Sequence, residues 1–215
     1  MDWFAQINAY CERGDASYWA EPVNAVTNLS FIIAAAIMWP RSAGLPMARV
    51  LCVILFVIGV GSYLFHTHAT AWAALADVVP IGLFILTYLF AINRDAVPLR
   101  TNWAVLATLL FIPYAALLVP VLHQIPFVRI SNFYWTVPIL LMIYAVFLRH
   151  HAELARGFWV GAAILTVSIT FRSLDARLCA ALPIGTHFMW HLLNGVMLGW
   201  MIEVYRRHML AGRTA

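Results

Sequence analysis

Apolar residues occur in long, nearly uninterrupted stretches along this chain, and short polar segments separate them. Seven of these stretches approach the roughly 20 residues that a helix needs to cross a bilayer. Backbone polar groups find no water inside lipid, so such a stretch is expected to be helical. The pattern predicts an all-α integral membrane protein, a bundle of seven transmembrane helices that forms one domain over 1–215. The predicted spans are 23–39, 48–66, 71–92, 102–121, 133–148, 157–172 and 186–205.

The segment before the first span has a different character. Residues 1–22 are polar and acidic, with aromatic residues spaced among the charges. Trp and Tyr favour the depth at which lipid headgroups meet the hydrocarbon. This N-terminal segment is therefore expected to lie at the membrane interface.

Composition supports the membrane assignment and narrows the partners. The chain is 64% hydrophobic and 10% charged, with a mean hydropathy of +0.85, whereas soluble domains are about 45–50% apolar and about 25% charged. The sequence pI near 9.2 would suggest nucleic acid as the partner of a soluble protein. Here all 13 basic residues are arginines in or beside the connections. They are interpreted as topology signals, and no nucleic-acid partner is expected.

The distribution of these arginines predicts an orientation. With seven spans, four arginines fall on the N-terminal side of the membrane and nine on the opposite side. Connections rich in Lys and Arg stay in the cytoplasm. The N-terminus is therefore expected outside and the C-terminus in the cytoplasm, as a multi-pass protein.

Histidines gather at one predicted depth. His187 and His191 are four residues apart, so on a helix they share one face, and His66 closes the second span. With the N-terminus outside, all three lie in the outer half of the membrane. Hydrogen bonding to neighbouring helices would explain a single buried histidine. Three neutral imidazoles with an open fourth position are instead typical of a catalytic zinc.

Two further polar residues fall at the same depth. Ser62 precedes His66 by one turn, and Asp77 follows it by eleven residues near the start of the third span. Ser62 has an alternative role as a small helix-packing residue, and Asp77 as a helix cap. Beside a metal, Asp77 can act as general base toward a water and Ser62 can stabilise an oxyanion.

The three cysteines are too few for a disulfide scaffold. Cys52 lies within an apolar stretch. Cys11 and Cys179 both lie outside the predicted spans and on the same side, so they can pair if that side is oxidising.

These residues occur in three blocks that resemble the alkaline ceramidase family, part of a superfamily that includes adiponectin-receptor-like proteins. The first block is Tyr10-Cys11-Glu12, followed by the run from Ala20-Glu21 to Ser30. The second holds Ser62, His66 and Asp77. The third runs from Asp175 through Cys179 to His187 and His191. The blocks follow one another in order over nearly the full chain.

This resemblance implies a seven-helix amidohydrolase with zinc held by His66, His187 and His191, and with Ser62 and Asp77 serving the chemistry. It also implies a disulfide between Cys11 and Cys179. A calcium site near the zinc is a further implication. Its candidates here are Glu12 and Glu21, with Asp15 as a substitute, because Ala9 and Gly14 occupy positions where the family has Asp and Asn.

The resulting hypothesis is zinc-dependent hydrolysis of a lipid amide, ceramide or a related N-acyl sphingoid base, in the outer half of the membrane. Fatty acid and an amine-bearing base would be the products. The alternative is a seven-span receptor or scaffold with a structural zinc and little turnover. A metal or proton transporter is a weaker alternative, because the fourth and fifth spans offer no polar relay. No protein partner is inferred.

Overall fold

The computed structural model describes the backbone of residues 2–214 and the side chains of residues 2–212. Within this part of the chain the regular structure is helical and no strand forms, so the all-α prediction is confirmed. In chain order the elements are α1 Pro22–Thr27, α2 Leu29–Arg41, α3 Pro46–His68, α4 Ala71–Asp95, α5 Thr101–Leu109, α6 Phe111–His123, the 3-10 helix η1 Val128–Ser131, α7 Asn132–Phe147, α8 Ala152–Leu178 and α9 His187–Thr214.

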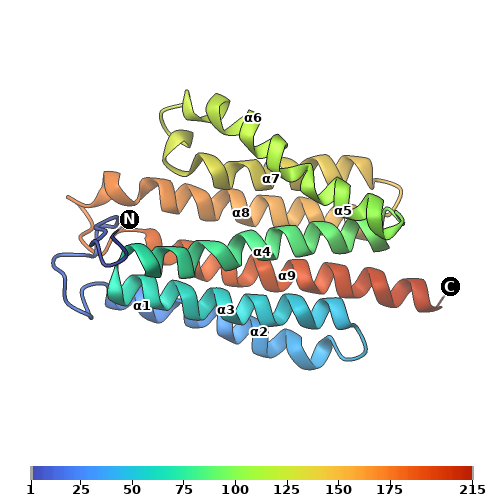
Figure 1. Cartoon of the computed structure of the whole chain (residues 1–215), viewed down its shortest axis with the longest axis horizontal. Helices are drawn as coiled ribbons and strands as arrows, with labels where there is room; N and C mark the ends of the chain where they lie inside the picture. The colour runs from blue at the N-terminus through green and yellow to red at the C-terminus, as the bar shows by residue number, and fades with distance from the viewer. Residues whose placement is uncertain (1, 215) are drawn as a thin grey trace.

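Six helical segments of the described chain are long and apolar enough to cross a membrane. They are Pro22–Arg41, Pro46–His68, Ala71–Asp95, Thr101–His123, Val128–Phe147 and Ala152–Leu178. The remaining long helix, α9, has 28 residues and packs against α2, α3 and α8. The helices run along a common long axis, and the N-terminal segment and the end of α9 lie at opposite ends of it (Figure 1).

The helices differ from the predicted spans in two respects. Asn28 separates α1 from α2 and Leu110 separates α5 from α6, so two predicted spans are each built from two helices. In addition, α8 extends beyond the predicted limits 157–172 at both ends. Hydropathy marks where the chain is apolar, whereas a helix continues into polar sequence at the membrane interface.

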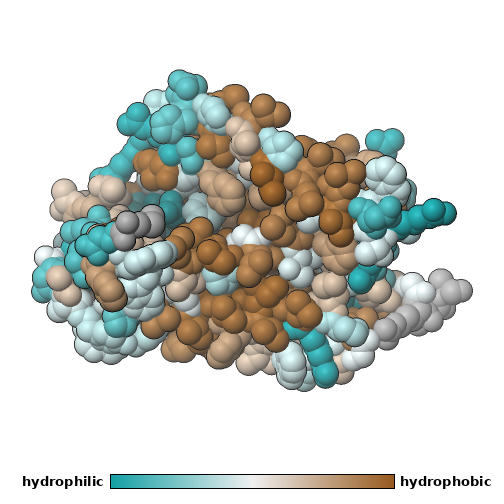
Figure 2. Space-filling view, in the orientation of Figure 1, coloured by the Kyte–Doolittle hydropathy of each residue, from teal (hydrophilic) through white to brown (hydrophobic). Residues whose placement is uncertain are grey.

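Apolar side chains fill the bundle and also cover its outside. One cluster of buried residues from α2, α3, α4, α7, α8 and α9 forms the core. Large apolar side chains such as Ile33, Leu83 and Leu117 are nevertheless exposed. Figure 2 shows a broad hydrophobic belt across the middle of the face in view, with hydrophilic residues concentrated toward the two ends of the bundle. Soluble monomers rarely expose such a surface, so the belt is the lipid-facing part of an integral membrane protein.

The N-terminal segment is irregular and lies against one end of the bundle (Figure 1). It pairs with the connection between α3 and α4, where Ile7 N–H donates to Ala69 O at 2.7 Å and Ala71 N–H donates to Ala5 O at 3.2 Å. An isolated antiparallel bridge joins Gln6 and Thr70. These bonds hold the segment beside the last turn of α3, which carries His66.

Candidate metal centre

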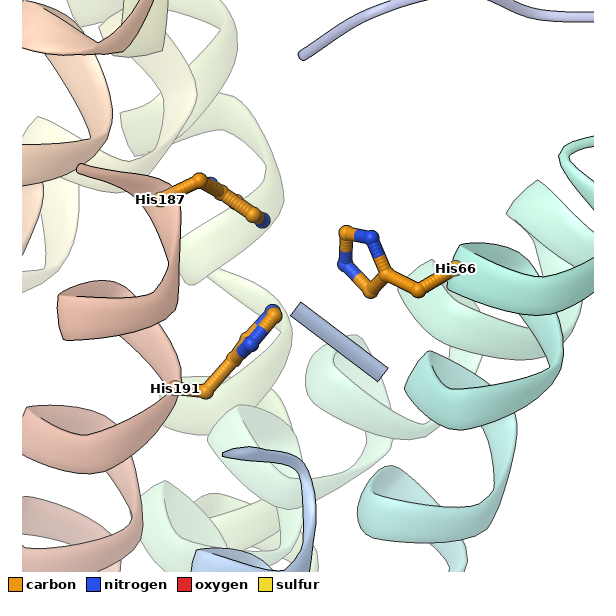
Figure 3. Close-up of side chains that lie close together, drawn as sticks. All are labelled: His66, His187 and His191. Carbon is orange, nitrogen blue, oxygen red and sulfur yellow. The ribbon is translucent and has the colours of Figure 1, made fainter. Parts of the chain in front are cut away.

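Three histidines from two helices meet at this end of the bundle. His66 lies in the last turn of α3, while His187 and His191 occupy the first two turns of α9. Their candidate ligand atoms all lie within 4.8 Å of one another, and each residue is at most 2% exposed. Figure 3 shows the two rings of α9 facing the ring of α3 across a shared space. Helix spacing and helix packing together therefore bring the three predicted ligands to one point.

The ring nitrogens at this point lack hydrogen-bond partners. Nε2 of His66, Nε2 of His191 and Nδ1 of His187 are buried and unpaired. Leaving a buried polar atom unpaired costs about 1–3 kcal/mol, which coordination of a cation would offset. Three imidazoles are also the donor set of one class of catalytic zinc site. The residues therefore fit a zinc ion.

The other nitrogens of two rings are fixed by hydrogen bonds. Nδ1 of His66 lies 2.6 Å from Oε2 of Glu21. Nδ1 of His191 lies 2.9 Å from Oγ1 of Thr27, whose own hydroxyl hydrogen faces carbonyl oxygens of α1. Each of the two rings thus carries its proton on Nδ1 and leaves the Nε2 lone pair available, the arrangement that orients metal-ligating histidines.

Glu21 is itself held by a buried cation. Arg13 Nε donates to Glu21 Oε1 at 2.5 Å, and both side chains are 2% exposed. A second nitrogen of Arg13 donates to the His66 carbonyl oxygen at 2.9 Å. Burial by itself would raise the pKa of Glu21, but the hydrogen bonds and charges of His66 and Arg13 hold it below its ordinary value. Glu21 is therefore an anion that orients His66.

Asp175 fixes the start of α9. Its Oδ1 accepts the backbone N–H groups of Thr186 at 2.7 Å and His187 at 2.9 Å, and its Oδ2 accepts Cys11 N–H at 3.0 Å. A carboxylate at this position pairs otherwise unsatisfied N–H groups and complements the helix dipole. Gly185, at φ +64°, passes so close that any side chain there would collide with this carboxylate. The bonds set the position of His187.

The N-terminal segment covers the histidines. Tyr10 stacks on His187, with ring centroids 3.6 Å apart and an angle of 17° between planes. Burial raises the pKa of the Tyr10 phenol, so the stacked ring is neutral. The next residue, Cys11, forms a disulfide with Cys179, and their Cα atoms are 5.2 Å apart. The disulfide and Asp175 thus tie Tyr10 to the end of the bundle that holds the histidines.

Ser62 and Asp77 lie beside the histidines on adjacent helices. Ser62 is buried on α3 one turn before His66, and Asp77 is half-buried on α4. Their side chains interact, and the Asp77 carboxylate lies within electrostatic range of His66. Asp77 does not occupy the N-cap of α4, where Thr70 lies. A hydroxyl and a carboxylate therefore accompany the three imidazoles.

A family model described as Ceramidase matches residues 6–214. The chain belongs to the ceramidase family. No match was found among curated proteins. The family resemblance predicted from the sequence is confirmed, and membership indicates hydrolysis of a lipid amide by a membrane-embedded protein.

The structure gives no support to the calcium site that the resemblance implies, and that site stays a prediction. Both carboxylate oxygens of Glu12 accept backbone N–H groups at the start of α1, from Val23 at 2.7 Å and from the next residue at 2.8 Å. Glu21 is bonded to Arg13 and His66, and Asp15 is exposed and accepts a backbone N–H two residues on. The carboxylate oxygens of Glu12 and Glu21 thus already accept hydrogen bonds from the protein, and the Arg13 guanidinium supplies a positive charge beside Glu21.

A close helix contact positions the Ser62–Asp77 pair. Gly61 faces the backbone of α4 so closely that a Cβ atom would collide with the carbonyl oxygen of Ala76. Ser62 directly follows Gly61 in the chain, and Asp77 directly follows Ala76. Glycine is required here because it alone allows the two backbones to approach.

Substitution of Gly61 by alanine is expected to separate α3 from α4 and displace Asp77 from His66. Overpacking of this kind costs about 1–3 kcal/mol, so we expect a lower melting temperature in detergent and weaker zinc retention. Gly82→Ala on α4 is the matched control, because nothing lies within 4 Å of its added Cβ. Equal melting temperatures and zinc contents for the two variants would contradict the role of the contact.

Several residues that build the site have no role in the sequence-based hypothesis. They are Tyr10, Arg13, Thr27, Arg172 and Asp175. Each acts through a contact with a segment far away in the chain, which no local pattern reveals. The sequence offered two signals: Tyr10, Thr27 and Asp175 fall in the blocks that resemble the family, and Arg172 is a charged residue at the end of an apolar stretch.

An apolar cavity opens beside the histidines. Its lining comes from α2, α3, α4, α7, α8 and α9. At the histidine end the lining includes Phe31, whose ring is 6.2 Å from that of His191. Trp190, next to His191 in the chain, also lines this end of the cavity. Met201 lines it further along α9. An aliphatic chain fits such a lining.

Proposed function

We propose that this protein is a zinc-dependent intramembrane amidohydrolase that cleaves the N-acyl amide of ceramide or a related lipid. The observation that carries the proposal is the set of three buried imidazoles with unpaired nitrogens. A carboxylate and a hydroxyl lie next to them, and an apolar cavity opens beside them. Fatty acid and a sphingoid base or related amine are the products.

Each of the five residues has its own role in the proposed reaction. His66, His187 and His191 would hold a zinc ion, which would supply a Lewis acid that polarises the amide carbonyl and acidifies water. Asp77 accepts a proton as the water oxygen bonds to the carbonyl carbon. The Ser62 hydroxyl donates a hydrogen bond to the oxyanion that develops. Asp77 then returns the proton to the leaving nitrogen as the carbon–nitrogen bond breaks.

The same proposal includes a topology. Six spanning segments and α9 make seven crossings, in one domain over 1–215, with the N-terminus outside and the C-terminus in the cytoplasm. The arginine distribution supports this orientation, and so does the opposite placement of the two chain ends (Figure 1). The Cys11–Cys179 disulfide lies at the histidine end, in keeping with an oxidising outer face.

The lipid's acyl chain occupies the cavity, which places its amide at the histidine end. Substrate already dissolved in the bilayer reaches this cavity without crossing water. The membrane is therefore both the solvent of the protein and the source of the substrate.

Replacement of Asp77 by Asn tests the acid–base assignment. We expect fatty-acid release from ceramide to fall by about 100- to 10,000-fold, the usual contribution of a general acid–base group. Zinc content and melting temperature should change little, because Asp77 is not a metal ligand. The assay uses purified protein in detergent–lipid micelles, and Asp15→Asn, an exposed carboxylate, is the control. Undiminished hydrolysis would remove Asp77 from the mechanism.

The alternative, a receptor or scaffold with a structural zinc, makes a different prediction. Zinc removal would then lower the melting temperature, while zinc-loaded wild-type protein would release no fatty acid from any lipid amide offered. That combination of results would replace the hydrolase proposal.

A further inference from the structure

Arg172 is a membrane-embedded cation with no acidic partner. It lies in the spanning helix α8. Its guanidinium donates to three neutral oxygens, Ser131 Oγ at 2.8 Å, Ile130 O at 3.4 Å and the Tyr10 hydroxyl at 3.5 Å. No ion pair within 4.0 Å involves Arg172 among the residues that the structure describes, whereas Arg13 and Arg94 each have one. A charge in a membrane segment is costly and tends to mark a functional site.

Two aromatic rings hold this guanidinium in place. Its central carbon lies 5.0 Å from the Tyr134 ring centroid and 5.6 Å from that of Trp190. Both rings also line the apolar cavity. Arg172 does not itself line the cavity, but it lies against the two rings that form the cavity wall near the histidines. Stacking restricts the planar group. Ser131, Ile130 and Tyr10 take three of its five N–H donors, which leaves two for a ligand.

The same guanidinium is close to the metal centre. The Tyr10 ring, whose hydroxyl it contacts, stacks on His187. Trp190 directly precedes His191 in the chain. The Asp77 carboxylate lies within electrostatic range without forming an ion pair. A lipid with its acyl chain in the cavity and its amide at the histidines thus presents the amine side of the amide toward Arg172.

We propose that Arg172 binds an anionic oxygen group, a carboxylate or a phosphate, on the amine side of the lipid amide. The forked donors of a guanidinium match both groups in a bidentate manner. This inference rests on the proposed hydrolase function and specifies its substrate class. The preferred substrates are acidic lipid amides, such as N-acyl amino acids or phosphorylated ceramides, over their neutral counterparts.

The experiment compares lipids with the same acyl amide that do or do not carry an acidic group on the amine side. N-oleoylglycine is paired with N-oleoylethanolamine, and ceramide 1-phosphate is paired with ceramide; the two pairs distinguish a carboxylate from a phosphate. Wild-type protein should favour the acidic member of at least one pair by about 10- to 100-fold in kcat/KM, the range of a hydrogen bond to a charged group. Arg172→Gln should remove this preference mainly through KM, so that activity on the acidic member falls about 10- to 100-fold more than activity on the neutral member. Arg177→Gln, five residues along the same helix, should behave as wild type, because the Arg177 guanidinium bonds the Pro126 carbonyl oxygen and packs on the Phe127 ring.

Four other results would overturn the inference. Equal wild-type activity on both members of both pairs excludes an anion preference, whether or not any variant folds. Equal loss on acidic and neutral lipids in Arg172→Gln, or a retained preference, assigns Arg172 a structural role. If no lipid is hydrolysed, the hydrolase proposal fails. A measurement of lipid binding then tests the anion-binding role of Arg172 by itself. In that case N-oleoylglycine should raise the melting temperature of wild-type protein more than N-oleoylethanolamine does, and Arg172→Gln should abolish the difference; an unchanged difference contradicts the inference.

Discussion

Replacement of His191 by alanine is expected to leave the protein without bound zinc and to lower fatty-acid release by about 1,000-fold or more, the scale of an essential catalytic group. The His191 ring is fully buried, and its Nε2 has no other partner. Two imidazoles alone do not make the three-ligand site of a catalytic zinc. Elemental analysis of purified protein and a fatty-acid release assay measure the two effects.

The control for this substitution is His68→Ala. His68 lies two residues after His66 on α3, is exposed and contacts Tyr18 and Trp72 rather than the centre. It should keep both zinc and activity. A chelator should reproduce the His191→Ala phenotype in wild-type protein, and added zinc should reverse it there but not in the variant. Full zinc occupancy in His191→Ala would exclude this residue as a ligand.

The second large effect is expected for Arg13→Gln. This change leaves the buried Glu21 carboxylate without its guanidinium, and breaking a buried ion pair typically costs about 3–5 kcal/mol. It also disturbs the partner of His66 Nδ1, and loss of such an outer partner lowers metal affinity by about 10- to 100-fold. Melting in detergent and zinc titration against a competing chelator measure these changes.

A double variant separates charge from packing. Arg13→Gln combined with Glu21→Gln removes both charges, so it should recover part of the stability that Arg13→Gln loses. Calcium should restore neither zinc affinity nor melting temperature in any of these proteins, because Glu12 and Glu21 are already bonded. A calcium-dependent rise in the wild-type melting temperature would contradict this interpretation.

The helical architecture was predictable because apolar stretches of bilayer length leave the backbone little alternative. The common depth of the histidines was predictable from the order of the spans. The second span ends on the outer side of the membrane, so the third must begin there. With seven spans, the last span also begins on that side. His66, His187 and His191 were therefore identifiable as a set.

The supports of the centre were not predictable in this way. Asp175 bonds Cys11, 164 residues away in the chain, and Arg172 contacts Tyr10 across 162 residues. Such contacts depend on side-chain directions that only the packed bundle defines. The calcium hypothesis shows the same limit. The carboxylate of Glu12 is present as the sequence suggested, but the free N–H groups of α1 take its oxygens.

The division of the ligands between α3 and α9 has a consequence for biogenesis. Roughly 120 residues separate His66 from His187, which a ribosome needs about 6 to 25 seconds to synthesise. Throughout that interval the nascent chain holds one imidazole, a cysteine without its mate and an uncovered cavity. A zinc ion bound by all three histidines could therefore be acquired only after membrane insertion of the last helix. On the proposed function, a stalled or truncated translation product would be inert rather than partly active.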